Sequence, residues 1–113
     1  PEDAPRIAEE IGMEYGQELA AEIGLPDDTG FEGAVQAVAR TMMGMGFETE
    51  AHPAARTLLT RSCPFGETAT NHPEIVCKLD QGIVRGLLDA TQTRSDVLVT
   101  PHTDHSEHCV TDV

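Results

Sequence analysis

Residues 71–90, NHPEIVCKLDQGIVRGLLDA, decide the fold that this sequence predicts. Pro73 suits the first turn of a helix, and Asn71 is the expected cap. From there, apolar residues recur at helical spacing and form one broad face: Ile75, Val76, Leu79, Ile83, Val84, Leu87 and Leu88. Gly82 and Gly86 lie four residues apart and allow a second backbone to approach closely. We therefore expect a long helix that packs tightly against another helix or a sheet.

Two more helices are expected on the N-terminal side of this stretch. Residues 5–23 carry an apolar residue at every fourth position, which predicts an amphipathic helix with a single narrow stripe: Ile7, Ile11, Tyr15, Leu19 and Ile23. Nine acids and one arginine lie between residues 2 and 28. This acidic surface is either simply solvated or part of an arm that packs on a partner subunit. A second helix is expected after Thr29, which forms a capping box with Glu32.

Four short strands complete the predicted fold. Residues 47–52 and 56–62 flank a turn at 53–55 and read as an antiparallel hairpin. Residues 96–100 and 108–113 are the third and fourth strands. The order is therefore helix, helix, strand, strand, helix, strand, strand. This order predicts an α+β domain in which helices cover one face of an antiparallel four-stranded sheet.

Length, charge and composition exclude several classes of protein. A chain of 113 residues is long enough for one domain with a real core but not for two. It has no apolar run of about 18 residues and no leader pattern, so we expect a cytoplasmic protein without a membrane span. The net charge is −13, with 20 acidic and 7 basic residues, so this chain is not expected to bind nucleic acid by itself. Such an acid excess is typical of proteins from a very salty cytoplasm.

The three cysteines are the main candidates for chemistry. Cys63, Cys77 and Cys109 fall on three separate predicted elements. An odd number of cysteines without an export signal argues against a disulfide framework. Three thiolates brought together by the fold, with a fourth donor, suit a zinc ion or an iron–sulfur cluster. The alternative is that they are buried cysteines that act as small hydrophobic residues.

Three further side chains are candidates for the fourth ligand. Asp80 follows Cys77 by three residues and so lies on the same helix face, as a ligand or as a hydrogen-bond acceptor behind one. His102 and His105 lie in a histidine-rich loop just before Cys109. These two histidines are either ligands or solvated surface residues. An enzyme is not expected, because His108 and Cys109 are strand neighbours that point to opposite faces and no known catalytic motif is present.

Several segments resemble one protein family. They are residues 58–65 (LLTRSCPF), residues 72–82 (HPEIVCKLDQG), residues 86–88 (GLL) and the pair Cys109-Val110. Together they resemble the C-terminal half of bacterial and archaeal winged-helix transcriptional regulators of the ArsR-like or DeoR-like type. These regulators include the iron–sulfur-assembly repressor of the SUF operon. The resemblance extends over most of the chain.

The resemblance implies that residues 1–113 are a single C-terminal effector and dimerisation domain. It implies a homodimer, which touches DNA only through an N-terminal domain absent from this chain, and a metal or iron–sulfur cofactor held by Cys63, Cys77 and Cys109. Relatives carry His at the position of Asp80, so the fourth ligand stays open. Two alternatives remain: a small-ligand module like the 4-vinyl-reductase type, whose cysteine spacing is similar, and a dimerisation module with a structural zinc.

Overall fold

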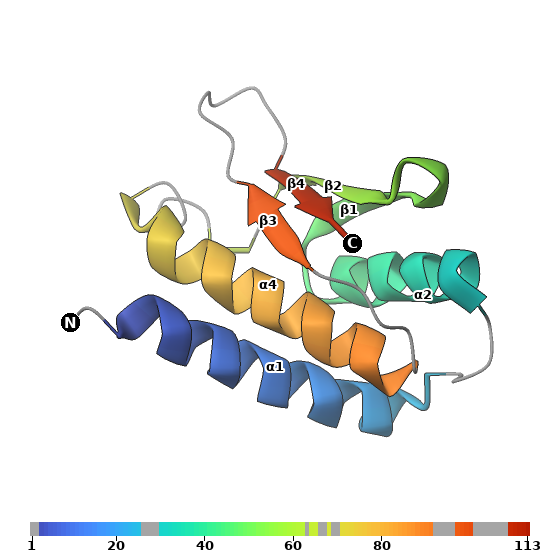
Figure 1. The fold of residues 1–113 in the computed structure, drawn as a ribbon, viewed down its shortest axis with the longest axis horizontal. Helices are drawn as coiled ribbons and strands as arrows, with labels where there is room; N and C mark the ends of the chain where they lie inside the picture. The colour runs from blue at the N-terminus through green and yellow to red at the C-terminus, as the bar shows by residue number, and fades with distance from the viewer. Residues whose placement is uncertain are drawn as a thin grey trace.

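The computed structural model describes residues 3–25, 30–62, 64, 65, 68, 71–91, 97–100 and 109–113. These residues form an α+β domain in which three helices pack against a four-stranded antiparallel sheet (Figure 1). The order of elements is α-α-β-β-α-β-β, so the predicted fold class and element order are confirmed. The capping box at Thr29 lies outside the described residues.

Three helices lie on one side of the sheet (Figure 1). They are α1 (Ala4–Ile23), α2 (Gly30–Gly44) and α4 (Pro73–Ala90). α1 packs mainly against α4, and α4 lies between α1 and the sheet (Figure 1). The predicted cap of α4 is wrong by one residue: His72, not Asn71, is the N-cap, and its side chain makes no capping hydrogen bond.

The sheet has the strand order β1-β2-β4-β3. Its strands are β1 (Glu48–His52), β2 (Thr57–Ser62), β3 (Leu98–Thr100) and β4 (Cys109–Asp112). A single 3-10 turn at Pro53–Ala55 joins β1 to β2 and makes the predicted hairpin. Burial alternates along β2 and β4, as expected for a sheet with one covered face: Leu58 and Thr111 are buried, whereas Arg61 and Asp112 are exposed.

The α1–α4 contact is built on glycine, as the sequence of α4 predicts. Gly12 and Gly16 of α1 face Gly82 and Gly86 of α4, and a Cβ on any of the four would collide with a backbone carbonyl oxygen of the other helix. The buried residues of α1 are accordingly all small: Ala8, Gly12, Gly16 and Ala20. Side chains this small let the two backbones touch along their length.

Candidate functional site

The structure describes three of the six predicted ligands. Cys77 and Asp80 lie on α4, and Cys109 is the first residue of β4. Cys63, His102 and His105 lie outside the described residues. The two described histidines, His52 and His72, lie at the surface next to Glu50 and Glu74. The geometry of the candidate site is therefore built from the first three.

Cys77 and Asp80 lie on the face of α4 that points toward the sheet. They are followed on the same face by Val84 and Leu87, at helical spacing. Val84 and Leu87 belong to the core cluster that also contains Leu58 of β2. Asp80 is therefore one turn before the apolar core, beneath the sheet. The opposite face of α4 carries the glycines that contact α1.

The strand register directs Cys109 toward the same layer. Cys109 pairs with Thr60 of β2, and residues paired across strands point to the same side of a sheet. Thr60 is buried, and so is Thr111, which lies two residues beyond Cys109 on the same face of β4. Cys109 itself is half-buried, like Cys77. Cys109 thus lies on the covered face of the sheet, but the structure does not cluster it with Cys77 of α4.

A patch of buried threonines lines this layer on the sheet side, and sequence reasoning missed it. Thr49, Thr60 and Thr111 are all less than a tenth exposed. The hydroxyls of Thr49 and Thr60 lie 3.4 Å apart, within hydrogen-bond reach across β1 and β2. The signal was present in the sequence as threonines within the predicted strands, where a purely apolar core would carry Val or Ile. The covered face of the sheet therefore carries buried hydroxyls on β1, β2 and β4, beside the apolar Leu58.

Asp80 is the most unusual charged side chain that the structure describes. It is 6% exposed, and its Oδ1 atom has no hydrogen-bond partner among the described residues. Burial away from water raises the pKa of this carboxyl from 3.8 to about 7. A buried carboxylate is costly unless a cation or a set of donors compensates it. This position consequently favours either a protonated acid or a bound cation.

The residues present fit a metal site in part. Thiolates with one carboxylate or histidine are a donor set for zinc, and the unpartnered oxygen of Asp80 is available to such an ion. Across the described ranges, however, no three His, Cys, Asp or Glu side chains are grouped closely enough to hold a metal ion. A complete site would therefore need donors from outside those ranges, such as Cys63, His102 or His105.

Gln81, the neighbour of Asp80, connects three elements. Its Nε2 donates to Glu9 Oε2 of α1 at 2.7 Å, and its Oε1 accepts from the backbone N–H of Val99 in β3 at 3.2 Å. Arg85 also donates to Glu9 Oε2, at 2.9 Å. Partial burial by itself would raise the pKa of Glu9, but the hydrogen bonds from Gln81 and Arg85 lower it overall. These bonds tie α1, α4 and the sheet edge together beside the candidate site.

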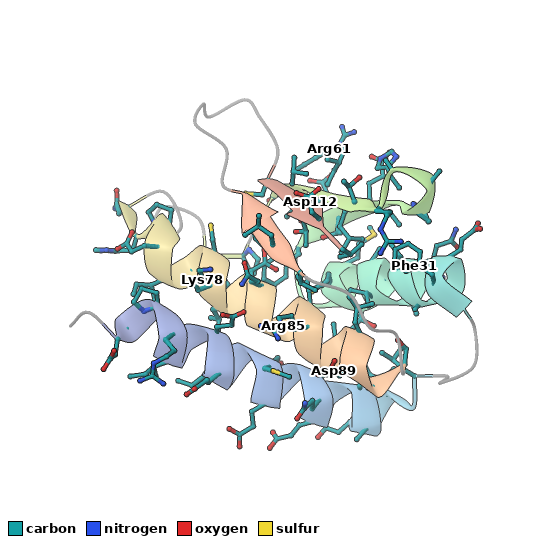
Figure 2. All side chains as sticks on the ribbon, viewed as in Figure 1. Phe31, Arg61, Lys78, Arg85, Asp89 and Asp112 are labelled. Atoms are coloured by element: carbon teal, nitrogen blue, oxygen red, sulfur yellow. The ribbon has the colours of Figure 1, made fainter. Side chains whose placement is uncertain are left out.

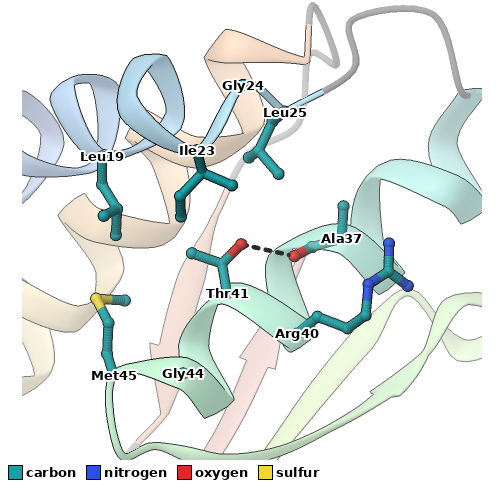
Figure 3. Close-up of a pocket in the computed structure, with 9 residues that line it drawn as sticks. All are labelled: Leu19, Ile23, Gly24, Leu25, Ala37, Arg40, Thr41, Gly44 and Met45. Carbon is teal, nitrogen blue, oxygen red and sulfur yellow. Dashed lines mark hydrogen bonds between the residues drawn. The ribbon is translucent and has the colours of Figure 1, made fainter.

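Two apolar grooves open along the flank of α1. One, of about 490 Å³, lies between Ile11 and Tyr15 of α1 and a wall that includes Phe47 and Phe65. The other, of about 460 Å³, is shown in Figure 3, where Leu19, Ile23 and Leu25 point toward Thr41 and Met45. Met45 borders both grooves. The volumes of both grooves lie in the range of pockets that bind small molecules, as the alternative of a small-ligand-binding module requires.

Comparison with known protein families, with curated proteins and with solved structures finds no match for this chain. None of the described helices is both long and apolar enough to cross a membrane. The candidate site must therefore be judged on its own geometry and chemistry.

Proposed function

We propose that this chain is the effector domain of a cytoplasmic winged-helix transcriptional regulator and that it binds a metal ion or an iron–sulfur cluster. The ligands are Cys63, Cys77 and Cys109, with Asp80, His102 or His105 as the fourth. The observation that carries the proposal is the buried carboxyl of Asp80, on the helix face that also bears Cys77, whose Oδ1 has no hydrogen-bond partner among the described residues. DNA is contacted through a separate domain, and this chain is not an enzyme.

Electrostatics explains why a cation would suit this place. Removal of a carboxylate from water costs stability that an apolar side chain would not cost. A natural sequence keeps such a group where it binds or switches something, and strongly perturbed carboxyls are enriched at functional sites. A bound cation would be the positively charged partner that Oδ1 of Asp80 lacks among the described residues. The cysteine thiolates would complete the coordination of this cation. The metal ion or cluster, when bound, would give the domain a ligand-bound form, and this form would be lost when metal is scarce or when the cluster is oxidised.

α4 is the element that would transmit such a change. One of its faces carries Cys77 and Asp80, and the other packs against α1 through Gly82 and Gly86. A shift of α4 on ligand binding must therefore move α1 with it, because packed glycine backbones leave no slack. A displacement of α1 is a means to change the spacing of DNA-binding domains in a dimer.

Metal analysis on anaerobically purified protein tests the proposal. We expect about one equivalent of metal or one cluster per chain, seen by elemental analysis and by the absorption spectrum. Cys77→Ser and Asp80→Asn should lower the bound metal, whereas Asp89→Asn, at an exposed position of the same helix, should retain it. A metal-free wild-type protein whose thermal stability is unchanged by Cys77→Ser would contradict the proposal.

A further inference from the structure

Gln81 forms a hydrogen bond at each end of its carboxamide, although only 5% of the residue is exposed. Its Nε2 donates to Oε2 of Glu9 in α1, at 2.7 Å, and its Oε1 accepts from the backbone N–H of Val99 in β3, at 3.2 Å. The carboxylate needs a donor and the N–H needs an acceptor, and one carboxamide offers both. The two partners therefore fix both the residue type at position 81 and the orientation of its amide.

The bond to Val99 secures the edge of the sheet. β3 is the edge strand in the order β1-β2-β4-β3, and it has three residues. Backbone N–H groups on the outer side of an edge strand are unpaired unless another part of the chain covers them. β3 lies beside α4, and Gln81 of α4 accepts the N–H of Val99 (Figure 1). This side chain therefore attaches the sheet edge to α4.

The strand held in this way is the neighbour of the strand that carries Cys109. Val99 pairs with Thr111 of β4, which lies two residues beyond Cys109. At the other end of the connection, Gln81 directly follows Asp80 on α4. A side chain that fixes β3 to α4 thus also limits how far β4 can move from the helix that carries the other described candidate ligands.

We propose that Gln81 is a positioning residue for the candidate site: through β3 it holds Cys109 of β4 in place relative to α4, the helix that carries Cys77. The inference rests on the proposed function, because it requires a metal ion or cluster that both cysteines bind. The structure does not cluster the two thiols, so binding must order them. A connection between α4 and β3 reduces the entropy that this ordering costs.

A purely structural role for Gln81 makes a different prediction about the two thiols. A general weakening of the fold would expose Cys77 and Cys109 alike. Loss of the connection to β3 should instead release Cys109 from the metal and leave Cys77 bound, because Cys77 belongs to α4 itself. The response of each thiol by itself therefore distinguishes positioning from overall stability.

Alkylation with iodoacetamide, followed by mass spectrometry of each cysteine, tests the inference. The full chain is used as purified anaerobically, and again after EDTA and phenanthroline have removed its metal. In wild type the metal should slow alkylation of Cys77 and Cys109 at least about tenfold, because a coordinated thiolate is a poor nucleophile. In Gln81→Met only Cys77 should keep this protection. The matched control, Arg85→Met, removes the other donor to Glu9 and should keep both thiols protected.

Two further variants separate the hydrogen bonds from the size and polarity of the side chain. Gln81→Asn keeps the amide but is one methylene shorter, so it should also lose the protection of Cys109, and it replaces Gln81→Met if that variant does not fold. In Glu9→Gln/Gln81→Glu the amide and the carboxylate exchange places, so both hydrogen bonds can form again. This double variant should restore the protection of Cys109 to within about threefold of wild type.

Hydrogen exchange at the Val99 amide follows the same bond without any metal. Exchange should be at least about tenfold faster in Gln81→Met than in wild type, and the double variant should slow it again. Circular dichroism of each variant ensures that only folded protein is compared. An exchange rate that Gln81→Met leaves unchanged would show that this bond does not hold β3, and the inference would fail.

The alkylation results distinguish a failure of the inference from a failure of the proposed function. If wild type reacts equally with and without its metal, Cys77 and Cys109 share no site, and both are wrong. If wild type is protected and Gln81→Met is protected equally, only the inference is wrong. Equal loss of protection at both thiols in Gln81→Met would also overturn it, as would a double variant without rescue.

Discussion

The two faces of α4 differ in a way that separates stability from function. The face toward α1 is closed by Gly82 and Gly86, where backbone meets backbone without space for one more carbon atom. The face toward the sheet carries Cys77 and Asp80, and there a carboxyl oxygen is buried with no partner among the described residues. Figure 2 shows side chains of α4 that lie outside both faces, including Lys78, Arg85 and Asp89.

This difference between the two faces indicates which of them stabilises the fold. The glycine face contributes packing and holds α1 in place. The sheet face holds a group that costs stability, which a sequence retains where the group has a task. Substitutions on the two faces should therefore have opposite effects on the free energy of unfolding, and the following predictions test that contrast.

The largest effect is expected on the glycine face. In Gly82→Val the new side chain would collide with the carbonyl of Glu9, so the two helices must separate. We expect a loss of at least about 4 kcal/mol in the free energy of unfolding, measured by urea denaturation. The control is Gly44→Val at the end of α2, where no atom lies within 4 Å, and it should change stability by less than about 0.5 kcal/mol. Equal effects at the two positions would refute the close contact.

On the face of α4 toward the sheet, substitution of Asp80 should raise the free energy of unfolding instead of lowering it. In metal-free protein the pKa of Asp80 is raised from 3.8 to about 7, so between these values the folded state binds a proton that the unfolded state has lost. Stability should therefore fall as pH rises from 4 to 7, and above 7 the penalty is fully present, at roughly 4 kcal/mol. Asp80→Asn should remove this component and gain stability relative to wild type as pH rises.

Urea denaturation of both proteins between pH 4 and 8 measures this difference. Asp89→Asn serves as the control, because Asp89 is an exposed acid on the same helix, and its curve should run parallel to that of wild type. If the curves of Asp80→Asn and wild type are also parallel, Asp80 is not held in the protonated form by burial.

A smaller effect is expected for the hydrogen bonds by which Gln81 and Arg85 link α4 to α1 and β3. Gln81→Met leaves the buried N–H of Val99 without its acceptor and should cost about 2 kcal/mol. Arg85→Met removes an exposed ion pair with Glu9 and should cost less than about 1 kcal/mol. In NMR titrations both variants should raise the pKa of Glu9. An unchanged pKa of Glu9 in Gln81→Met would show that the bond is not formed in solution.

The smallest effect is expected on the exposed flank of α1. Ile11→Ser should change the unfolding free energy of the monomer by less than about 1 kcal/mol, because the side chain is 56% exposed. Ile83→Ser, the same exchange on the opposite wall of the groove, should cost about 3 kcal/mol or more, because Ile83 is 4% exposed. Thermal unfolding at low protein concentration and low salt distinguishes the two. A large loss for Ile11→Ser would mean that the stripe is covered within one chain.

The spacing of apolar residues and the positions of Gly and Pro predicted the fold well. They did not predict which face of α1 is buried. The helix expected at 5–23 is found at Ala4–Ile23, and the order of all elements is as expected. The buried residues of α1, however, are Ala8, Gly12, Gly16 and Ala20, which have the same four-residue spacing as the stripe. A hydrophobicity pattern does not reveal burial by close backbone contact, so nothing in the pattern indicated that these small residues form the buried face of α1.

The candidate site could be predicted only as a set of residue types. The i, i+3 spacing placed Cys77 and Asp80 on one face, but the direction of that face became clear only through the core contacts of Val84 and Leu87. The orientation of Cys109 follows from its pairing with Thr60, and a strand register cannot be read from one sequence. The predicted ligand roles all stay predictions: those of Cys63, Cys77, Asp80, His102, His105 and Cys109.

X-ray absorption at the metal edge, recorded on anaerobically purified protein, tests the central claim most directly. If Cys77 and Cys109 bind the same ion, the first shell contains two or three sulfur atoms at about 2.3 Å. If they bind an iron–sulfur cluster, the first shell of the iron contains about four, because sulfide also binds it. Asp80→Asn should leave the sulfur ligands in place and change only the oxygen or nitrogen ligands of the metal. A first shell of oxygen and nitrogen alone, or a protein without metal, would contradict the assignment of these cysteines to a single site.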